Sequence, residues 1–365
     1  MGLDVAVNER KPLTLITGAT GAIGPAVLEA FRSSGFSIRT LSIDPPKSGF
    51  LPEGVEARIG DVTDPAAVSS AMQDADAVIH MAALLHIANP PSSMRERYVR
   101  INVQGTSTVA EAAVQAGVRR VVLFSTIAVY GPSRGQVLTE DTPPCPDTDY
   151  AQTKLAAEKI VLDAKGEDGS RIGAALRLGA VYGPGIKGNY ERLLRSLAAG
   201  RFIPVGDGSN RRSLIYDKDV GRAAVLAATH SNAAGRVFNV TDGRFHSMKT
   251  IIATLCDALE RPPPGYSLPL APALRAASML EKILRRTRLP LPQTVAALSK
   301  YAEDMAVDGS RIQQELGFLP GYDLTAGWRE TVREMRRAGA LLTPNAFLIS
   351  SWPSSCPASL PSRCC

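Results

Sequence analysis

The sequence predicts an α/β protein of the Rossmann type, in which a doubly wound parallel sheet is joined to a smaller, irregular C-terminal substrate lobe. In the first half of the chain, short apolar runs such as VVLF at 121–124 alternate with amphipathic stretches, as in parallel sheets covered on both faces. A glycine-rich turn, TGATGAIG at 17–24, joins the first such pair. After about residue 180, turn-rich stretches such as YGPGIKGN break the chain into smaller pieces.

The predicted elements follow in order along the chain. Strands are predicted where β-branched and aliphatic residues gather: Leu13–Thr17, Ser37–Ile43, Ala77–Met81, Arg120–Ser125 and Gly173–Leu178. Helices are predicted where apolar residues recur at helical spacing: Pro25–Ser34, Pro65–Gln73, Gly105–Ala116, Tyr150–Ala164, 310–317 and 324–337. We therefore expect a Rossmann domain at 1–180 and a substrate lobe at 181–340. Residues 341–365 are rich in Ser and Pro with one charge, Arg363, and this composition predicts a disordered tail.

Composition excludes several classes of protein. The 365 residues are 45% hydrophobic and 21% charged, with a net charge of +6 and no dense Lys/Arg block, so we expect a globular protein without a nucleic-acid partner. No apolar run approaches the roughly 18 residues of a membrane span, and Asp4 and Glu9 make the N-terminus unlike a secretion signal. The five cysteines form no CxxC, and the four histidines are scattered. We expect no metal site, no disulfide framework and a cytoplasmic location.

The glycine-rich turn predicts a dinucleotide site, because it lies between a strand and a helix. Gly18 permits a tight turn, Gly21 lets the backbone approach a pyrophosphate, and Gly24 lets the helix pack closely on the sheet. The free N–H groups at the helix N-terminus then face the phosphates. Asp44 lies 20 residues after Gly24, where an acceptor for the adenosine ribose is expected. A carboxylate there favours NAD over NADP, although Asp44 also fits a turn before two prolines and NADP is not excluded.

A candidate reacting group lies in YAQTK at 150–154, which places Tyr150 and Lys154 on one face of a helix. A phenol with a pKa near 10 must lose about three pKa units to act as a base near neutrality, and a fixed ammonium group stabilises its anion. Ser125 and Thr126 follow an apolar strand, so their hydroxyls are expected at the carboxyl edge of the sheet, where ligands bind. Thr126 is the candidate to hydrogen-bond the substrate oxygen. A surface helix pair and a plain strand-terminal turn are the alternatives.

Taken together, these motifs resemble the extended short-chain dehydrogenase/reductases, also called NAD-dependent epimerase/dehydratases. The resemblance covers about residues 1–337; besides the glycine turn and the Tyr/Lys pair it includes GDVTD with Asp61, HMAA at 80–83, INVQGT with Asn102, RLGAVYGPG at 177–185 and RSLIYDKD at 212–219. It implies catalysis by Thr126, Tyr150 and Lys154. Asp61 also fits a plain turn cap. The cofactor contacts that the resemblance implies are Gly18, Thr20, Gly21, Ala22, Ile23, Gly24, Asp44, Asp61, Val62, Met81, Ala82, Ala83, Asn102, Ser125, Tyr150, Lys154 and Gly179.

The residues after Thr126 bear on the type of reaction. Dehydratases of the family have an Asp-Glu pair there, whereas Ile127 and Ala128 follow in this chain and supply neither acid nor base for eliminating water. Hydride transfer at a secondary alcohol or ketone remains, either as net oxidation or reduction or as epimerisation.

The substrate lobe contains features of two branches of the family. Asn189 and Arg212 resemble the residues with which the nucleotide-sugar branch binds a diphosphate, and Arg suits phosphate oxygens. Against this, Ala180 replaces an asparagine of many sugar epimerases, and no later arginine matches their nucleoside clamp. The apolar and basic stretch 265–293 is similar to the branch that oxidises 3β-hydroxysteroids; such a helix suits an apolar pocket or a membrane surface. A nucleotide sugar is the preferred substrate and a hydrophobic alcohol the alternative.

Two further expectations rest on the resemblance. A non-catalytic dinucleotide sensor or scaffold is a second class of function, but such members usually lose the Tyr or the Lys, and this chain has both. The helices at 105–116 and 150–164 have the form of a pair that often makes a two-fold four-helix interface in the family, so a homodimer is expected.

Overall fold

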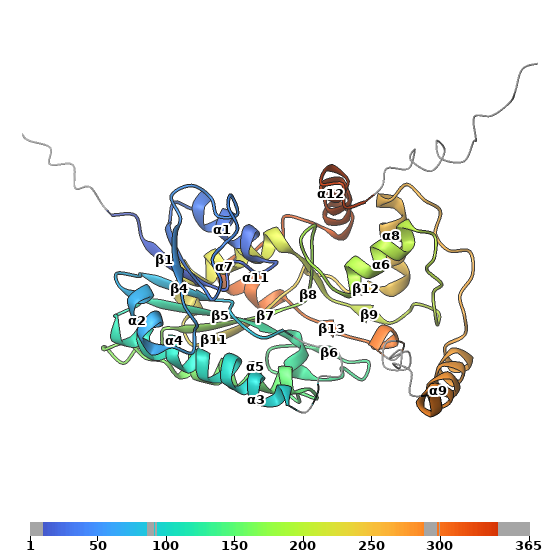
Figure 1. Ribbon diagram of the computed structural model, residues 1–365, viewed down its shortest axis with the longest axis horizontal. Coiled ribbons are helices and arrows are strands. Elements are labelled where there is room, and N and C mark those ends of the chain that lie inside the picture. Colours follow the sequence, from blue (N-terminus) through green and yellow to red (C-terminus); the bar gives the residue numbers. More distant parts are fainter. Residues whose placement is uncertain (1–9, 86–90, 92, 288–297, 299, 342–365) are drawn as a thin grey trace, which may run out of the picture.

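A seven-stranded parallel sheet forms the centre of the molecule (Figure 1). The structure is a computed structural model, and it describes residues 10–85, 91, 93–287, 298 and 300–341. The strands lie in the order β11-β7-β5-β4-β1-β2-β3, and each neighbouring pair is parallel. Their bounds are β1 (Leu13–Thr17), β2 (Ser37–Ser42), β3 (Glu56–Ile59), β4 (Ala77–His80), β5 (Arg120–Thr126), β7 (Gly173–Leu178) and β11 (Arg236–Val240). The predicted Rossmann-type fold is confirmed.

The five predicted strands are all present, each with its ends within one residue of the prediction. The sequence did not reveal the two edge strands, β3 and β11. In β3 the residues Ala57, Arg58 and Ile59 are exposed, so no apolar run marks the strand. Strand formation depends strongly on context. An edge strand can therefore form from a segment with a weak local pattern once a neighbouring strand offers backbone partners.

Helices cover both faces of the sheet, as Figure 1 shows. One face carries α1 (Gly24–Ser33), α7 (Asp217–Thr229) and α11 (Ser310–Leu316). The other carries α2 (Pro65–Met72), α4 (Gly105–Gln115) and α5 (Asp149–Asp163). Helix α7 packs so closely on α1 that a Cβ at Gly221 would lie 2.7 Å from the carbonyl oxygen of Ala26. Glycine at this position therefore allows the two helices to meet. Shorter elements connect these layers: α3 (Met94–Tyr98), the π-helical η1 (Val99–Gln104) and two 3₁₀ turns, η2 (Ile127–Tyr130) and η3 (Ser231–Ala233).

A second core lies beside the carboxyl edge of the sheet. Helices α6 (Asn189–Ala198), α8 (Met248–Ala258) and α12 (Leu324–Arg337) enclose it around the buried Trp328. The lobe also contains three two-stranded pairs: β8 (Ala180–Tyr182) with β10 (Leu214–Tyr216), β9 (Arg211–Arg212) with β12 (His246–Ser247), and β6 (Val137–Leu138) with β13 (Ala306–Val307). The first pair contributes to this core, whereas β6 and β13 pack in a separate small cluster with Ile127 and Tyr130. Helix α9 (Leu270–Thr287) lies at the end of the molecule farthest from β1 (Figure 1).

The chain passes between the two cores more than once. Helices α7 and α11 and strand β11 come from residues 181–340, yet they pack on or extend the main sheet. The part of the chain beyond residue 180 is therefore shared between the sheet layer and the lobe. The tail predicted to be disordered lies, apart from Leu341, outside the described residues. Within the described ranges, no helix is both long enough and apolar enough to cross a bilayer.

Candidate active site

The glycine-rich turn follows β1 at the carboxyl edge of the sheet. Gly18 adopts a left-handed backbone (φ +73°), and a Cβ on it would lie 2.7 Å from the backbone nitrogen of Ala82. A Cβ on Gly24 would lie 1.7 Å from the carbonyl oxygen of Ala19. Neither position has room for a side chain, because the turn must fold tightly against β4 and onto α1.

The same turn leaves its outer surface open. Thr20, Gly21 and Ala22 are exposed, and Ile23, at the start of α1, provides no side-chain cap for the first N–H groups of the helix. Uncapped N–H groups at a helix N-terminus attract phosphate oxygens. The turn therefore fits a dinucleotide pyrophosphate.

The position of the turn in the sheet supports this interpretation. Chain connections run from β1 outward to β2 on one side, while β4 lies on the other side of β1, so the strand order reverses there. Ligands of open α/β sheets bind at such a switch point. Met81, Ala82 and Ala83 follow β4 and are partly exposed, and the Ala82 N–H donates to Thr17 Oγ1 (3.3 Å). The predicted cofactor residues of β1 and β4 are thus neighbours.

The predicted reacting residues also come together. Tyr150 lies in the first turn of α5, and its hydroxyl is hydrogen-bonded to Thr126 at the end of β5. The Thr126 hydroxyl also accepts from the Ala128 N–H (3.2 Å), which caps η2. Lys154 lies one helical turn after Tyr150 and is 2% exposed. Two elements far apart in sequence therefore place the three groups at one sheet edge.

Burial controls the protonation of both ionisable groups. It raises the pKa of Tyr150 to about 12, although the hydrogen bond from Thr126 acts in the opposite direction. Burial lowers the pKa of Lys154 to about 8, opposed by the negative charge of Glu158. At pH 7 the phenol is protonated and the lysine is mostly charged. The tyrosine is therefore ready to donate a proton, and it needs added positive charge before it can accept one.

A buried ion pair lies behind these residues. Glu158, one turn beyond Lys154 on α5, accepts from Arg177 of β7 in a two-pronged arrangement with contacts of 2.7 to 3.2 Å. Ser125 donates to Glu158 Oε1 (2.5 Å), and the Arg177 guanidinium lies 4.7 Å from the ring centroid of Tyr130. The network ties β5, α5 and β7 together where Thr126 and Lys154 project. The Ser125 hydroxyl, expected at the cofactor, is engaged inside the protein.

His80, the last residue of β4, is held in one tautomer. Thr106 donates to the carbonyl oxygen of Asn102 (2.6 Å) and therefore accepts from His80 Nε2 (3.0 Å). His80 Nδ1 then accepts from the Thr17 hydroxyl (2.7 Å). Burial, with the nearby charge of Lys154, lowers the pKa of His80 to about 3. The neutral imidazole thus positions the ends of β1 and β4.

Asn102, in η1, joins the loop after β4 to the helix of the reacting residues. Its Oδ1 accepts from the Leu84 N–H (2.7 Å), and its Nδ2 donates to the Leu84 carbonyl (3.1 Å) and to Thr153 Oγ1 (3.2 Å). Thr153 in turn donates to the carbonyl of Tyr150 (2.9 Å). In this structure Asn102 therefore acts on the site by positioning backbone.

The remaining predicted cofactor residues lie along the same edge. Asp44 is exposed just after β2. Asp61 Oδ1 accepts from the Thr63 N–H (2.9 Å), so Asp61 forms the turn cap that is the alternative to a cofactor contact. Val62 is buried. Gly179 follows β7, and a Cβ on it would lie 3.0 Å from the Ser213 carbonyl oxygen.

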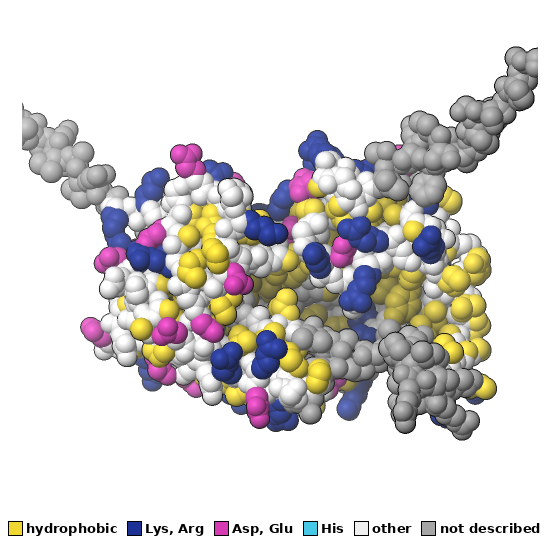
Figure 2. All heavy atoms as spheres, in the orientation of Figure 1, with side chains coloured by type: hydrophobic (Ala, Val, Ile, Leu, Met, Phe, Trp, Pro, Cys, Tyr) yellow, Lys and Arg dark blue, Asp and Glu magenta, His cyan; other side chains and the backbone are white. Residues whose placement is uncertain are grey.

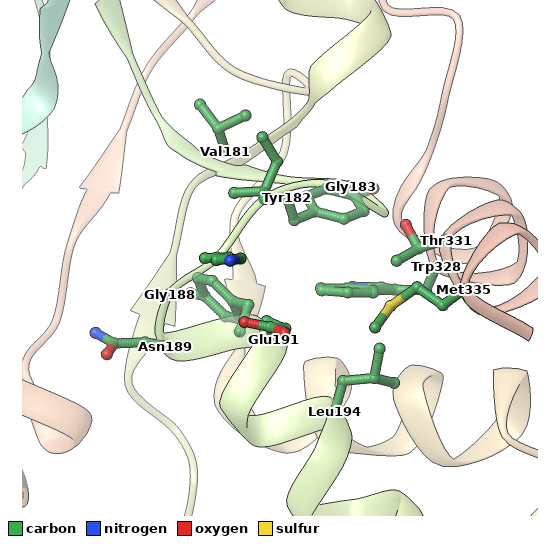
Figure 3. Close-up of a pocket in the computed structure, with 13 residues that line it drawn as sticks. Val181, Tyr182, Gly183, Gly188, Asn189, Glu191, Leu194, Trp328, Thr331 and Met335 are labelled. Atoms are coloured by element: carbon green, nitrogen blue, oxygen red, sulfur yellow. The ribbon is translucent and has the colours of Figure 1, made fainter. Parts of the chain in front are cut away.

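Asn189 is exposed at the start of α6, beside a cavity of about 40 Å³ between α6, β8 and α12. Figure 3 shows its amide pointing away from Trp328 and Met335. The cavity wall includes Tyr182 stacked on Trp328 (4.3 Å between ring centroids). A cavity of this size is too small for a sugar, so we assign it no ligand.

Arg212 lies on β9 and is held by the chain itself. Its Nη2 donates to the carbonyl oxygens of Lys300 (2.5 Å) and Tyr301 (3.1 Å), and Glu303 lies 3.9 Å from its Nη1. The preceding residue, Arg211, pairs with Asp304 (2.7 Å) in the wall of a cavity of about 400 Å³. This second cavity has room for a substrate group. A phosphate bound at Arg212 would have to compete with the Lys300 and Tyr301 carbonyls for the guanidinium group.

Sequence reasoning missed Glu158, and it saw His80, Thr106 and Arg177 only as members of the family motifs. One further signal was available: Arg177 is a charged residue within the otherwise apolar run GAALRL at 173–178, and charged residues are almost never fully buried unless paired. Its partner was not visible, because only folding brings α5 and β7 together. Within the described part of the chain, no group of three or more His, Cys, Asp or Glu residues is arranged to hold a metal.

The chain is similar to known proteins along most of its length. The model of the NAD dependent epimerase/dehydratase family matches residues 14–241. N-acetyl-alpha-D-glucosaminyl-diphospho-ditrans,octacis-undecaprenol 4-epimerase of Escherichia coli O157:H7 is 27% identical over 87% of this chain and 94% of its own length. Isoform 2 of the Arabidopsis thaliana 3beta-hydroxysteroid-dehydrogenase/decarboxylase is 26% identical over 90% of this chain and 62% of its own. Among solved structures, MoeE5 in complex with UDP-glucose and NAD superimposes with a TM-score of 0.70, at 28% identity over 89% of this chain and 99% of that protein.

Proposed function

Because the chain belongs to the NAD dependent epimerase/dehydratase family, we propose that it is an NAD-dependent enzyme that catalyses hydride transfer at a secondary alcohol or ketone. The observation that carries this proposal is the hydrogen bond between Tyr150 and Thr126 beside the buried Lys154, at the edge that carries the glycine-rich turn. Bound NAD supplies the hydride acceptor or donor. Gly18, Gly24 and the exposed turn between them would hold its pyrophosphate.

The three residues have distinct roles in the proposal. Tyr150 exchanges a proton with the substrate oxygen, and Thr126 hydrogen-bonds the same oxygen and orients it. Lys154 supplies the positive charge that lowers the cost of a phenolate on Tyr150. Since Ile127 and Ala128 follow Thr126, no side chain there can supply the acid and base of a dehydration. The reaction is an oxidation, a reduction or an epimerisation.

We propose a sugar carried on a diphosphate as the substrate. MoeE5 was solved with UDP-glucose, and the bacterial relative acts on a sugar joined through a diphosphate to undecaprenol. In this chain, the cavity of about 400 Å³ lined by Arg211 offers space for the carrier. Arg212, the next residue of β9, is the candidate for its phosphates, although its side chain does not line that cavity. A hydrophobic alcohol is the second candidate, favoured by the engagement of Arg212 with the Lys300 and Tyr301 carbonyls.

A Tyr150→Phe variant tests the catalytic proposal. Loss of the phenol should lower the rate of NADH formation or of epimer exchange by about 10²- to 10⁴-fold, while the variant should still bind NAD. Tyr216→Phe is the matched control, because its hydroxyl is also buried but has no hydrogen-bond partner. Unchanged turnover in the Tyr150→Phe variant would refute the assignment.

A ligand screen tests the substrate. The NAD-loaded protein is incubated separately with UDP-sugars, polyprenyl-diphosphate sugars and sterol-like alcohols. Binding is followed by thermal shift and turnover by NADH absorbance. Turnover of either diphosphate sugar supports the first candidate, and an Arg212→Lys variant should then raise its KM. Turnover of the alcohols alone would replace it with the second.

A further inference from the structure

An apolar surface lies at the end of the molecule formed by α9 and the loop before it. Tyr266 is 67% exposed, Met279 65%, and Leu268 and Leu280 45% each. Figure 2 shows hydrophobic side chains gathered on this side of the molecule, at the right of the view. Residues 262–274 contain no charged residue at all. A contiguous exposed apolar surface of this kind usually marks a contact site.

The same segment carries most of the excess charge of the protein. Residues 261–288 contain six basic residues and one acidic residue, a net charge of +5, while the whole chain has +6. On α9 itself, Arg275 and Lys282 are exposed in the same helix turns as Met279 and Leu280. The face toward the protein contains the buried Ala277. The outward face of α9 thus combines apolar side chains with positive charge.

We propose that α9 and the loop at 262–269, here called the α9 surface, dock on a lipid bilayer that contains anionic headgroups. A helix that combines exposed apolar residues with basic ones binds in the interface of such a bilayer, because the apolar side chains enter the acyl boundary while the cations meet the headgroups. Contact between two copies through this surface would bring two segments of charge +5 together, which electrostatic repulsion opposes. The charge therefore favours an anionic membrane over a second copy.

The α9 surface also adjoins the cavity that is proposed to hold the carrier of the substrate. Leu270, the first residue of α9, lines the cavity of about 400 Å³. The backbone of Leu268 pairs with that of Pro204 (2.9 Å) and Gly206 (2.8 Å), and Gly206 belongs to the same cavity wall. Docking through the α9 surface would hold this cavity next to the headgroups, where a substrate with an apolar carrier is found. This consequence rests on the proposed function, whereas the docking itself does not.

Vesicle co-sedimentation of the full chain tests the proposal. The protein is expected to bind vesicles of phosphatidylcholine mixed with phosphatidylglycerol, to bind pure phosphatidylcholine much less, and to be released by salt. Met279→Glu and Lys282→Glu should each lower the partition coefficient at least fivefold. Leu319→Glu and Lys11→Glu are matched controls, since Leu319 is 69% exposed and Lys11 is exposed outside this surface; both should bind as the unaltered protein does.

Equal binding to both kinds of vesicle, or unchanged binding of the Met279→Glu and Lys282→Glu variants, would overturn the proposal. So would light scattering that shows self-association lost in Met279→Glu while no vesicle is bound. NAD binding and turnover of water-soluble substrates should be unchanged in all four variants. Failure of vesicle binding with intact turnover would therefore reject the docking and leave the proposed function standing.

Discussion

Replacing Lys154 with methionine should make the protein more stable and inactive. The substitution keeps the unbranched apolar stem and removes an ammonium group that is 2% exposed. Burial lowers the pKa of Lys154 from 10.5 to about 8. At about 1.4 kcal/mol per pKa unit, keeping this group charged at pH 7 costs the folded state about 3 kcal/mol.

The sign follows from proton binding. Between pH 8 and 10.5 the unfolded chain holds the lysine proton and the folded chain does not, so the stability of the unaltered protein rises with pH through this window. The extra stability that the folded protein gains when Lys154 is neutral is fully present above pH 10.5, and it is lost as the pH falls through about 8. Lys154→Met should therefore be more stable at pH 7 by about 1 to 3 kcal/mol, the lower figure allowing for imperfect packing of the new side chain. The advantage should shrink toward zero near pH 10.5.

Urea unfolding of the ligand-free protein at several pH values measures this difference, and NADH formation measures activity. Lys159→Met is the control, because Lys159 lies on the same helix and is exposed; its stability should change by less than about 0.5 kcal/mol. If Lys154→Met were less stable than the unaltered protein at pH 7, or if the difference did not vary with pH, burial of a charged lysine would not be the cause. Retained turnover would refute its role in the reaction.

Two further substitutions test the residues that support the site. Glu158→Gln should destabilise the protein by about 3 to 5 kcal/mol, because Arg177 would keep a buried charge without its partner. The control Glu29→Gln, which breaks the exposed pair with Arg32, should cost at most about 1 kcal/mol. Equal losses of stability in urea unfolding would contradict this reasoning. Gly24→Ala should weaken NAD binding at least tenfold and lower the free energy of unfolding by about 1 to 3 kcal/mol, since its Cβ would lie 1.7 Å from the Ala19 carbonyl oxygen. Normal NAD affinity in isothermal titration calorimetry would mean that the turn tolerates a side chain.

The parts of the fold that were predicted are those whose signal is local. The interior strands β1, β4, β5 and β7 are buried on both faces, so apolar residues predominate in each and the strand can be predicted without its neighbours. The edge strand β3 has no such run, and its residues become a strand only because β2 offers it backbone partners. The same reason explains why β11, far along the chain, was not assigned to the main sheet.

The lobe illustrates a second limit of sequence reasoning. Arg212 and Asn189 were predicted as diphosphate contacts from their places in two motifs. The structure places the Arg212 guanidinium on the Lys300 and Tyr301 carbonyls, 88 and 89 residues along the chain. No local pattern reports such contacts.

By itself, the sequence determined which chemistry this protein can bring to a substrate. A glycine turn between a strand and a helix, and a tyrosine one helical turn before a lysine, are short patterns whose geometry follows from backbone dihedrals and helical spacing. Only the tertiary structure decided how that chemistry is supported: which carboxylate neutralises Arg177, which tautomer His80 adopts, and how strongly burial shifts the pKa values of Tyr150 and Lys154. These properties depend on contacts between α5, β4, β5 and β7, and on the exclusion of water from between them. Both arise only when distant segments pack together.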